Sequence, residues 1–519
     1  MTAYLFVRVE RGPKTSSGLG VNALALGAAA GIAERPGDRR RRSQKRRPTP
    51  KTHGQSDDRR YAECHSALTL TGIDRKGECS STYLEEHMKI LRPSVAVIAT
   101  VGLLAAACGG ATTPVASPST SAQASAAATT RKLVIGFTAS QTGAQNLPSK
   151  KQTEGIQLWV DEVTKAGGIK IGNNVALIPE IKFYDDESKT DRVQALYTKL
   201  INDDKVDFLL SPYSSGLVKS AAVVSEQNGK VMVTAGGADD ATMEQGFKYI
   251  YQVYTPASKY LTAAIDLMLK LDPTIKKVAI VNEKDSFSTS VVAAAKPYAE
   301  SKGLQVVVSE GYDSGATDFN PFINKIVAAA PDAIIGGGHF PDGTTFAKQL
   351  YEKKVTARFV ALLVAPPEPT FADVGDAAQF IVGPSQWEPQ VKYSEAGAKA
   401  LSIPYYGITV DGFTKAYTAK FNVVPSYHVA GGFAAGLMLQ KALEDAQSTD
   451  AEKVRAALDK LDIMTFFGRV KFSTDPKAHG KQVAHEMVYV QWQRDAAGKL
   501  GTQIVWPLEA KSSDAQLRK

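Results

Sequence analysis

The sequence is poor in cysteine and histidine, the residues on which disulfide frameworks and most metal sites depend. Its three cysteines, Cys64, Cys79 and Cys108, are too few and too irregularly spaced for a disulfide scaffold or a zinc site. Four of the seven histidines follow residue 107, and they show no metal-ligand spacing: His339, His428, His479 and His485. We therefore expect no metal and no cofactor.

Catalytic motifs are also lacking. The chain contains no G-x-S-x-G, H-E-x-x-H or C-x-x-C pattern. The glycine-rich segment 336–343 lacks the Gly-Lys-Ser/Thr that completes a phosphate-binding loop. A serine hydrolase using Ser214 or Ser215 is the remaining enzymatic interpretation, and the sequence ties no histidine to either serine. We expect a protein that is not an enzyme.

Excess charge is confined to the N-terminal region. The formal net charge is +8, but residues 1–107 hold 18 Lys and Arg against 10 Asp and Glu. Residues 108–519 therefore carry 43 basic and 43 acidic side chains and are formally neutral. A nucleic-acid role for this larger part loses its main support.

An export signal is predicted from Met88 onward. Lys89 and Arg92 precede the apolar stretch 95–107, which is too short to span a bilayer comfortably. The small residues 105–107 and Cys108 make this segment resemble a bacterial lipoprotein signal, which implies that Cys108 is acylated and becomes the mature N-terminus. Ala105 stands where that class prefers leucine, so an ordinary cleaved signal is the alternative.

The segments around this signal are not expected to build a core. Residues 1–87 are rich in arginine and have little hydrophobic periodicity. We expect translation to start at Met88, with a real disordered basic extension as the alternative. After the signal, 88–107, residues 108–130 contain little besides small and polar residues and predict a lipid-anchored flexible tether. The folded body then begins at Arg131.

Strands and helices alternate along the body. The apolar run Leu133–Phe137 is typical of a buried parallel strand, and a helix with apolar residues at helical spacing follows over 155–166. This alternation continues to Thr234, and a second series of the same kind runs from Tyr260 to Lys353. Two such series predict an α/β protein with two similar, doubly wound lobes.

Ligands of open α/β sheets lie beyond the carboxyl ends of the strands. Five loops are expected there: 138–146, 211–216, 235–239, 283–287 and 337–343. In the second loop, hydroxyls and free backbone N–H groups at a helix start suit an anion, although Ser215 can equally be a plain N-cap. Gly236 and Gly237 allow close approach of a ligand to the backbone, or form a simple turn.

Several segments together resemble the periplasmic Leu/Ile/Val-binding protein family, the type I solute-binding components of ABC importers. The segments that carry the likeness are 159–163 with 167–169, Tyr184-Asp185-Asp186, Tyr213-Ser214-Ser215-Gly216, 312–319 and 468–472. The resemblance covers residues 131 to about 508. It implies two Rossmann-like lobes joined by three crossovers, which we expect near 254–257, 383–388 and 466–470.

The lobes implied by this resemblance are discontinuous in sequence. Lobe 1 is expected to contain residues 131–255 and 386–466, and lobe 2 residues 256–385 and 467–508. A disordered tail, 509–519, is expected to follow.

The resemblance also implies which residues hold the ligand. Ser214 and Ser215 match the loop that binds a ligand carboxylate, and an acidic residue near the second crossover, Glu368 or Glu388, competes for an ammonium group. Trp387 is interpreted as an aromatic wall of the site, with a core position as the alternative. The full expected set is Ser140, Gln141, Tyr213, Ser214, Ser215, Gly236, Gly237, Ala238, Phe287, His339, Phe340, Trp387 and Glu388.

The expected function is that of an exported, lipid-anchored, monomeric solute-binding protein. Its partners would be an amino acid or a related carboxylate, ABC permease subunits and, through the anchor, the membrane. Because the same lobes also serve in sensing, a ligand-sensing module that signals to a membrane receptor or regulator is the alternative.

Overall fold

The structure is a computed structural model that describes residues 129–172 and 174–518. The expected export signal, Cys108 and almost all of the tether lie outside the described residues. The described residues belong to one compact unit. No helix among them has the length and the apolar character needed to cross a membrane.

Lobe 1 is built on a six-stranded sheet in the order β2-β3-β1-β4-β5-β6. All neighbouring strands are parallel except β2 and β3. The strands are β1 (Thr129–Ala139), β2 (Ile169–Ile171), β3 (Val175–Asp185), β4 (Phe208–Leu210), β5 (Met232–Thr234) and β6 (Ile250–Gln252). The helices of this part are α1 (Asn146–Lys165), α2 (Thr190–Asn202), α3 (Ser215–Gln227) and α4 (Asp240–Met243).

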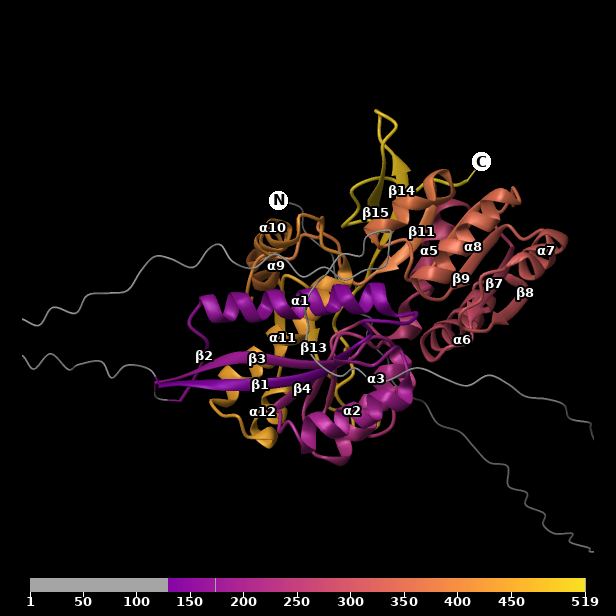
Figure 1. Cartoon of the computed structure of the whole chain (residues 1–519). Coiled ribbons are helices and arrows are strands. Elements are labelled where there is room, and N and C mark those ends of the chain that lie inside the picture. Colours follow the sequence, from indigo (N-terminus) through magenta and orange to yellow (C-terminus); the bar gives the residue numbers. More distant parts are fainter. Residues whose placement is uncertain (1–128, 173, 519) are drawn as a thin grey trace, which may run out of the picture. The chain divides into compact units, whose positions relative to one another are not determined.

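A later part of the chain returns to lobe 1. It contains α9 (Glu395–Ala400), α10 (Val410–Phe421), α11 (Tyr427–Ala446), α12 (Ala451–Leu458), β12 (Asp462–Thr465) and β13 (Gly468–Lys471). The helix α11 lies against α1, so segments far apart in sequence are side by side (Figure 1).

Lobe 2 contains a seven-stranded sheet in the order β15-β14-β11-β10-β9-β7-β8. Its strands are β7 (Lys277–Glu283), β8 (Gln305–Tyr312), β9 (Ala333–Gly337), β10 (Phe359–Leu362), β11 (Ile381–Ser385), β14 (Val488–Arg494) and β15 (Leu500–Trp506). Its helices are η1 (Ala257–Lys259), α5 (Thr262–Leu271), α6 (Ser286–Ser301), α7 (Asn320–Ala329), α8 (Phe340–Glu352) and η2 (Pro369–Ala378). The predicted α/β class and its two doubly wound lobes are confirmed.

Both faces of each sheet are covered, and successive side chains of a strand enter different apolar clusters. In β1, Leu133, Ile135 and Phe137 enter one apolar cluster, while Val134 packs against another on the opposite face. The same division occurs in β9, where Ile335 and Ile334 enter different clusters. Because successive residues point to opposite faces, continuous apolar runs are required in strands that are buried on both sides.

Two helix starts are set by the structure. The first begins at Asn146 rather than near residue 155. The helix α10 begins at Val410, because the Thr409 side chain accepts a hydrogen bond from Gly412 N–H at 3.1 Å and starts the helix there. Asn422 ends it in the left-handed conformation, with φ of 55°.

Three crossing segments are tied together at the hinge. Gln386 Oε1 accepts a hydrogen bond from Thr255 N–H at 3.0 Å, and its Nε2 donates to Thr255 O at 3.2 Å. The Thr255 hydroxyl lies 2.7 Å from His485 Nδ1. Burial lowers the pKa of His485 to about 4, so its imidazole is neutral and Nδ1 accepts from this hydroxyl. Each of the three residues belongs to a different crossing.

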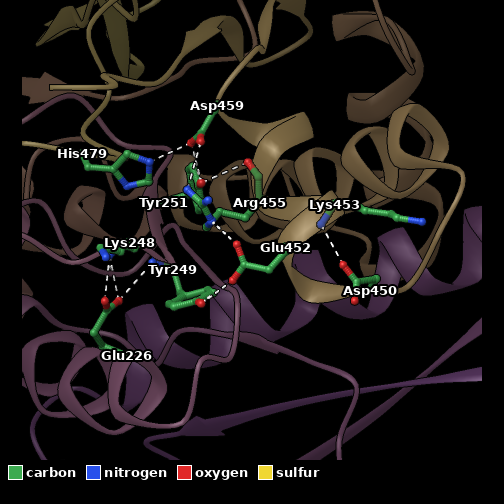
Figure 2. Close-up of polar contacts among 10 residues, drawn as sticks. All are labelled: Glu226, Lys248, Tyr249, Tyr251, Asp450, Glu452, Lys453, Arg455, Asp459 and His479. Atoms are coloured by element: carbon green, nitrogen blue, oxygen red, sulfur yellow. Dashed lines mark hydrogen bonds and ion pairs between the residues drawn. The ribbon is translucent and has the colours of Figure 1, made fainter. Parts of the chain in front are cut away.

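The third crossing lies later in the chain than residues 466–470. After β13, the chain stays on lobe 1, where Asp459 accepts hydrogen bonds from Tyr251 Oη at 2.6 Å and from His479 Nε2 at 2.7 Å (Figure 2). Gly480 O also accepts from Gln252 N–H in β6. The chain therefore reaches lobe 2 between His485 and β14.

The C-terminal segment differs from the expected disordered tail. Gln516 N–H donates to Gln491 Oε1 in β14 at 2.8 Å, and Arg518 N–H donates to Arg358 O at 2.8 Å. Backbone hydrogen bonds of this kind hold residues up to 518 against lobe 2.

Candidate functional site

A small cavity lies between the two lobes. Its free volume is about 10 Å³, so the closed lobes leave little space between them. Lobe 1 and the first crossing contribute Tyr213, Ser214, Ser215, Gly236, Ala238, Tyr254 and Tyr427, and Tyr260 lies between η1 and α5 of lobe 2. Lobe 2 contributes Phe287, His339 and Val364. Tyr213 and His339 are only 4% and 3% exposed, so the lobes are closed over the cavity.

Two helix N-termini reach this cavity from opposite lobes. Ser214 is the N-cap of α3 and His339 is the N-cap of α8, and neither helix has a side chain that caps its first turn. The unsatisfied N–H groups and the positive ends of the helix dipoles favour an anion at such a place. The N-terminus of α8 offers fewer donors than that of α3, because Pro341 in its first turn has no N–H.

The remaining wall is largely aromatic. The rings of Tyr260 and Phe287 lie edge to face with centroids 5.0 Å apart. Burial raises the pKa of Tyr213, Tyr254 and Tyr427, so these tyrosines remain neutral hydrogen-bond donors. The buried hydroxyl of Tyr254 has no hydrogen-bond partner within the described residues. This wall suits an apolar or aromatic body that carries a polar group.

The loops after β4 and β5 are fastened to each other. Ser215 Oγ accepts hydrogen bonds from Ala238 N–H at 3.0 Å and from Asp239 N–H at 3.3 Å. A Cβ on Gly236 would lie 1.8 Å from Pro212 O, so only glycine allows the two loops to approach this closely. The predicted helix-capping role of Ser215 is thus replaced by a bond to the neighbouring loop.

His339 connects the lobes. Its Nδ1 lies 3.2 Å from Tyr213 Oη in lobe 1, and its Nε2 lies 3.0 Å from Asp285 Oδ2 in lobe 2. Burial opposes protonation of the imidazole, but Asp285, Glu283 and Asp342 together raise the pKa of His339 to about 9. The cavity therefore has a cationic group beside its two helix N-termini.

Three carboxylates lie behind His339. Burial and the charge of Glu283 raise the pKa of Asp342 to about 6. Ligand atoms of Glu283, Asp285 and His339 lie within 4.8 Å of one another, so these residues are the candidates for holding a metal ion.

A second contact between the lobes involves one of the two carboxylates that were considered for an ammonium group. Glu368 pairs with His428 Nδ1 of α11, and both side chains are buried. Within the described residues, no carboxylate contributes to the wall of the cavity. Of the two acids considered for an ammonium group, Glu368 is thus already occupied by a histidine of the opposite lobe.

Seven of the residues expected from sequence come together in the cavity: Tyr213, Ser214, Ser215, Gly236, Ala238, Phe287 and His339. Ser140 and Gln141 lie elsewhere, in an open groove on lobe 1 with Lys150 and Glu154. Ser140 Oγ donates to Asp186 there at 2.6 Å.

The other four expected residues do not line the cavity. Trp387 is fully buried in the hinge core, where its ring packs against Phe413 and Phe466. Phe340 packs on the core of lobe 2, and a Cβ on Gly237 would press against Val218. Glu388 is buried near the second crossing, and its Oε1 has no hydrogen-bond partner within the described residues.

Four residues of the wall were not predicted. Tyr254 belongs to the first crossing and Tyr260 follows it between η1 and α5, so their place in the chain was a usable signal. Val364 follows β10, a strand that the alternation pattern did not reveal. Tyr427 opens α11 and reaches the site from a part of the chain with no local indication of binding.

Comparisons with known proteins agree with this architecture. The model of the periplasmic binding protein family matches residues 132–499. An amino acid binding protein of Pseudomonas aeruginosa is 24% identical over 229 residues, which are 44% of this chain and 60% of that protein. Leu/Ile/Val-binding protein homolog 8 of Brucella melitensis is 24% identical over 386 residues, 73% of this chain and 91% of that protein.

Solved structures share the fold at low sequence identity. The branched-chain amino acid transporter substrate-binding protein LivJ of Streptococcus pneumoniae, in complex with isoleucine, has a TM-score of 0.60 and 22% identity, covering 73% of this chain and all of that one. An ABC transporter solute-binding protein of R. palustris in complex with benzoate has a TM-score of 0.58 and 18% identity, covering 72% and 95%.

Proposed function

The chain belongs to the periplasmic binding protein family, and we propose that it is the solute-binding component of an ABC importer. It is an extracytoplasmic binding protein and not an enzyme. In this proposal, a small amino acid or amino-acid-like carboxylate binds between the lobes, which close and deliver it to a membrane permease. Differential affinity for the closed form would drive that closure.

The observation that carries the proposal is the convergence of α3 and α8 on one closed cavity. Their uncapped N-termini come from different lobes, and His339 lies between them as a cation. A carboxylate bound there would bridge both lobes through charge-assisted hydrogen bonds, which are stronger than neutral ones. Ligand binding and lobe closure would thereby be coupled.

Within this class, the wall favours a ligand whose amine is dispensable. The aromatic rings suit a branched or aromatic body, and Glu368 is engaged by His428. The fold is known to accept both kinds of ligand, since one similar structure holds isoleucine and another holds benzoate. We therefore propose an apolar or aromatic carboxylate, with or without an α-amine.

Calorimetric titration with matched ligands tests this proposal. The pairs are leucine with 4-methylpentanoate, phenylalanine with 3-phenylpropionate, and benzoate with benzamide. We expect at least one carboxylate to bind, its uncharged amide to bind at least tenfold more weakly, and removal of the amine to be tolerated. Binding of strongly polar ligands alone would contradict the proposal.

Two variants locate the binding site in the same experiment. We expect His339→Gln to lose at least tenfold in affinity for the carboxylate, because the cation is removed. Gln141→Ala serves as the control, since Gln141 is exposed in the separate groove. Equal loss in both variants would argue against the cavity.

We also propose that Cys108 anchors the protein to the outer face of the cell membrane through a lipid. The support is the predicted signal at 88–107, which precedes this cysteine. Intact-mass analysis of the membrane-extracted protein should find a diacylglyceryl-modified N-terminal cysteine, and Cys108→Ser should release the protein into the soluble fraction. An unmodified mature N-terminus elsewhere would exclude the anchor.

A further inference from the structure

The group of carboxylates behind the cavity has features that ligand binding does not explain. Glu283 ends β7, Asp285 is the N-cap of α6, His339 is the N-cap of α8, and Asp342 lies in the first turn of α8. All four come from the carboxyl ends of neighbouring parallel strands in lobe 2. The fold thus gathers three acids and one imidazole at one edge of the sheet.

This group has more negative than positive charge. Glu283 is 5% exposed, Asp342 is 7% exposed and His339 is 3% exposed. The nearby Lys284 points away and pairs with Asp313, whose side chain is 88% exposed. Burying several carboxylates with a single imidazolium is costly unless a further cation or proton is bound.

Glu283 is aimed into the group without a partner. Its buried Oε2 accepts no hydrogen bond within the described residues. A Cβ on Gly338 would lie 2.5 Å from Glu283 Oε2 and 2.5 Å from Asp342 Oδ2, so the glycine leaves room for both carboxylates at one point. The two oxygens therefore approach a common position beside His339.

We propose that Glu283, Asp285 and His339 form a binding site for a divalent transition-metal ion such as Zn²⁺ or Mn²⁺. The candidate ligand atoms lie within 4.8 Å of one another. The 3.0 Å between His339 Nε2 and Asp285 Oδ2 suits two neighbouring ligands of an ion with bonds of about 2.0–2.2 Å. One imidazole with two carboxylates favours a transition metal over Ca²⁺ or Mg²⁺, which prefer oxygen ligands alone.

The metal site stands apart from the ligand cavity but shares one residue with it. Bound through Nε2, the His339 ring keeps Nδ1 directed at Tyr213, which is 3.2 Å away. The ion would replace the proton between His339 and Asp285 and hold the imidazole in one orientation. The proposal departs from the expectation of no metal, which rested on spacing in the sequence, whereas Asp285 and His339 lie 54 residues apart.

Equilibrium dialysis of the tag-free mature protein against Zn²⁺ or Mn²⁺, followed by elemental analysis, tests the site. We expect one ion per chain in the wild type. Glu283→Gln, which preserves side-chain volume, should weaken binding at least tenfold, and Gly338→Ala should do the same by filling the space between the carboxylates. Asp313→Asn is the matched control and should retain the ion.

Each remaining outcome contradicts the proposal. Failure of the wild type to retain either metal, or equal retention by Glu283→Gln or Gly338→Ala, would overturn it. Circular dichroism melting of both variants verifies that they are folded before metal is measured. Titrating the metal-free protein with carboxylates is a separate measurement, so loss of this inference leaves the proposed function intact.

Discussion

The hydroxyl of Tyr213 and Nδ1 of His339 lie 3.2 Å apart, although the two side chains come from different lobes. Tyr213 precedes α3 in lobe 1, and His339 precedes α8 in lobe 2. Their contact and the pair Glu368–His428 cross the same interface beside the cavity. The closed arrangement is therefore stabilised by side chains of the protein itself, and a ligand adds to these bonds.

Removing the Tyr213 hydroxyl should shift the ligand-free protein toward open forms. A buried hydrogen bond contributes about 0.5–1.5 kcal/mol, so Tyr213→Phe should raise the ratio of open to closed molecules about two- to tenfold. Single-molecule energy transfer between dyes on the two lobes measures this ratio. Tyr351→Phe is the control, because Tyr351 is 48% exposed on lobe 2. An unchanged distribution in Tyr213→Phe would show that the contact does not stabilise closure.

Ser215→Ala should loosen the loop after β5. Ser215 Oγ accepts from two buried backbone N–H groups, and its loss would leave both without a partner. We expect the free energy of unfolding to fall by about 1–3 kcal/mol and the affinity for ligand to fall with it. Urea unfolding and calorimetry measure the two effects. Ser215→Thr keeps the oxygen and should restore most of both, and failure of that rescue would argue against the hydrogen bonds.

Asp459→Asn should weaken the attachment of the third crossing to lobe 1. The carboxylate accepts from Tyr251 and His479 (Figure 2), and these bonds, together with the charges of His479 and Arg455, outweigh burial and lower the pKa of Asp459. We expect a loss of about 1–2 kcal/mol near pH 7. Because the folded pKa lies below the unfolded value of 3.8, this contribution is fully present above 3.8 and is lost as the pH falls through the folded pKa, so the difference from wild type should shrink in acid. The exposed control Asp313→Asn should show no such loss.

Strand positions were predictable because burial on both faces leaves an apolar run that is visible locally. Leu133–Phe137 and the loops at the strand ends followed from that pattern, and His339 was found in one of these loops. Phe287 was assigned through the family resemblance. Trp387 could not be assigned from sequence, since its core partners Phe413 and Phe466 come from distant segments. Tyr427 and the pairing of Glu368 with His428 depend on the return of α11 to the cleft. No local pattern encodes such contacts.

Glu388 should make the stability of the fold depend on pH in an unusual direction. Burial raises the pKa of this carboxyl group from 4.5 to about 8, and the charge of Glu368 adds to the effect. A folded-state pKa above the unfolded value means that the folded protein binds the extra proton between these limits. The contribution is fully present below pH 4.5 and is lost as the pH rises through 8, at up to about 1.4 kcal/mol per pH unit.

Chemical denaturation of wild type and Glu388→Gln between pH 4.5 and 8.5 measures this contribution. The glutamine keeps the size of the side chain but cannot ionise, so the variant should gain stability relative to wild type as the pH increases. Glu352→Gln, at an exposed position on α8, should follow the wild-type profile. Parallel profiles for wild type and Glu388→Gln would contradict the prediction, because they would mean that Glu388 is ionised and solvated in the native protein. The burial of Glu388 and its unpartnered Oε1 argue against that state.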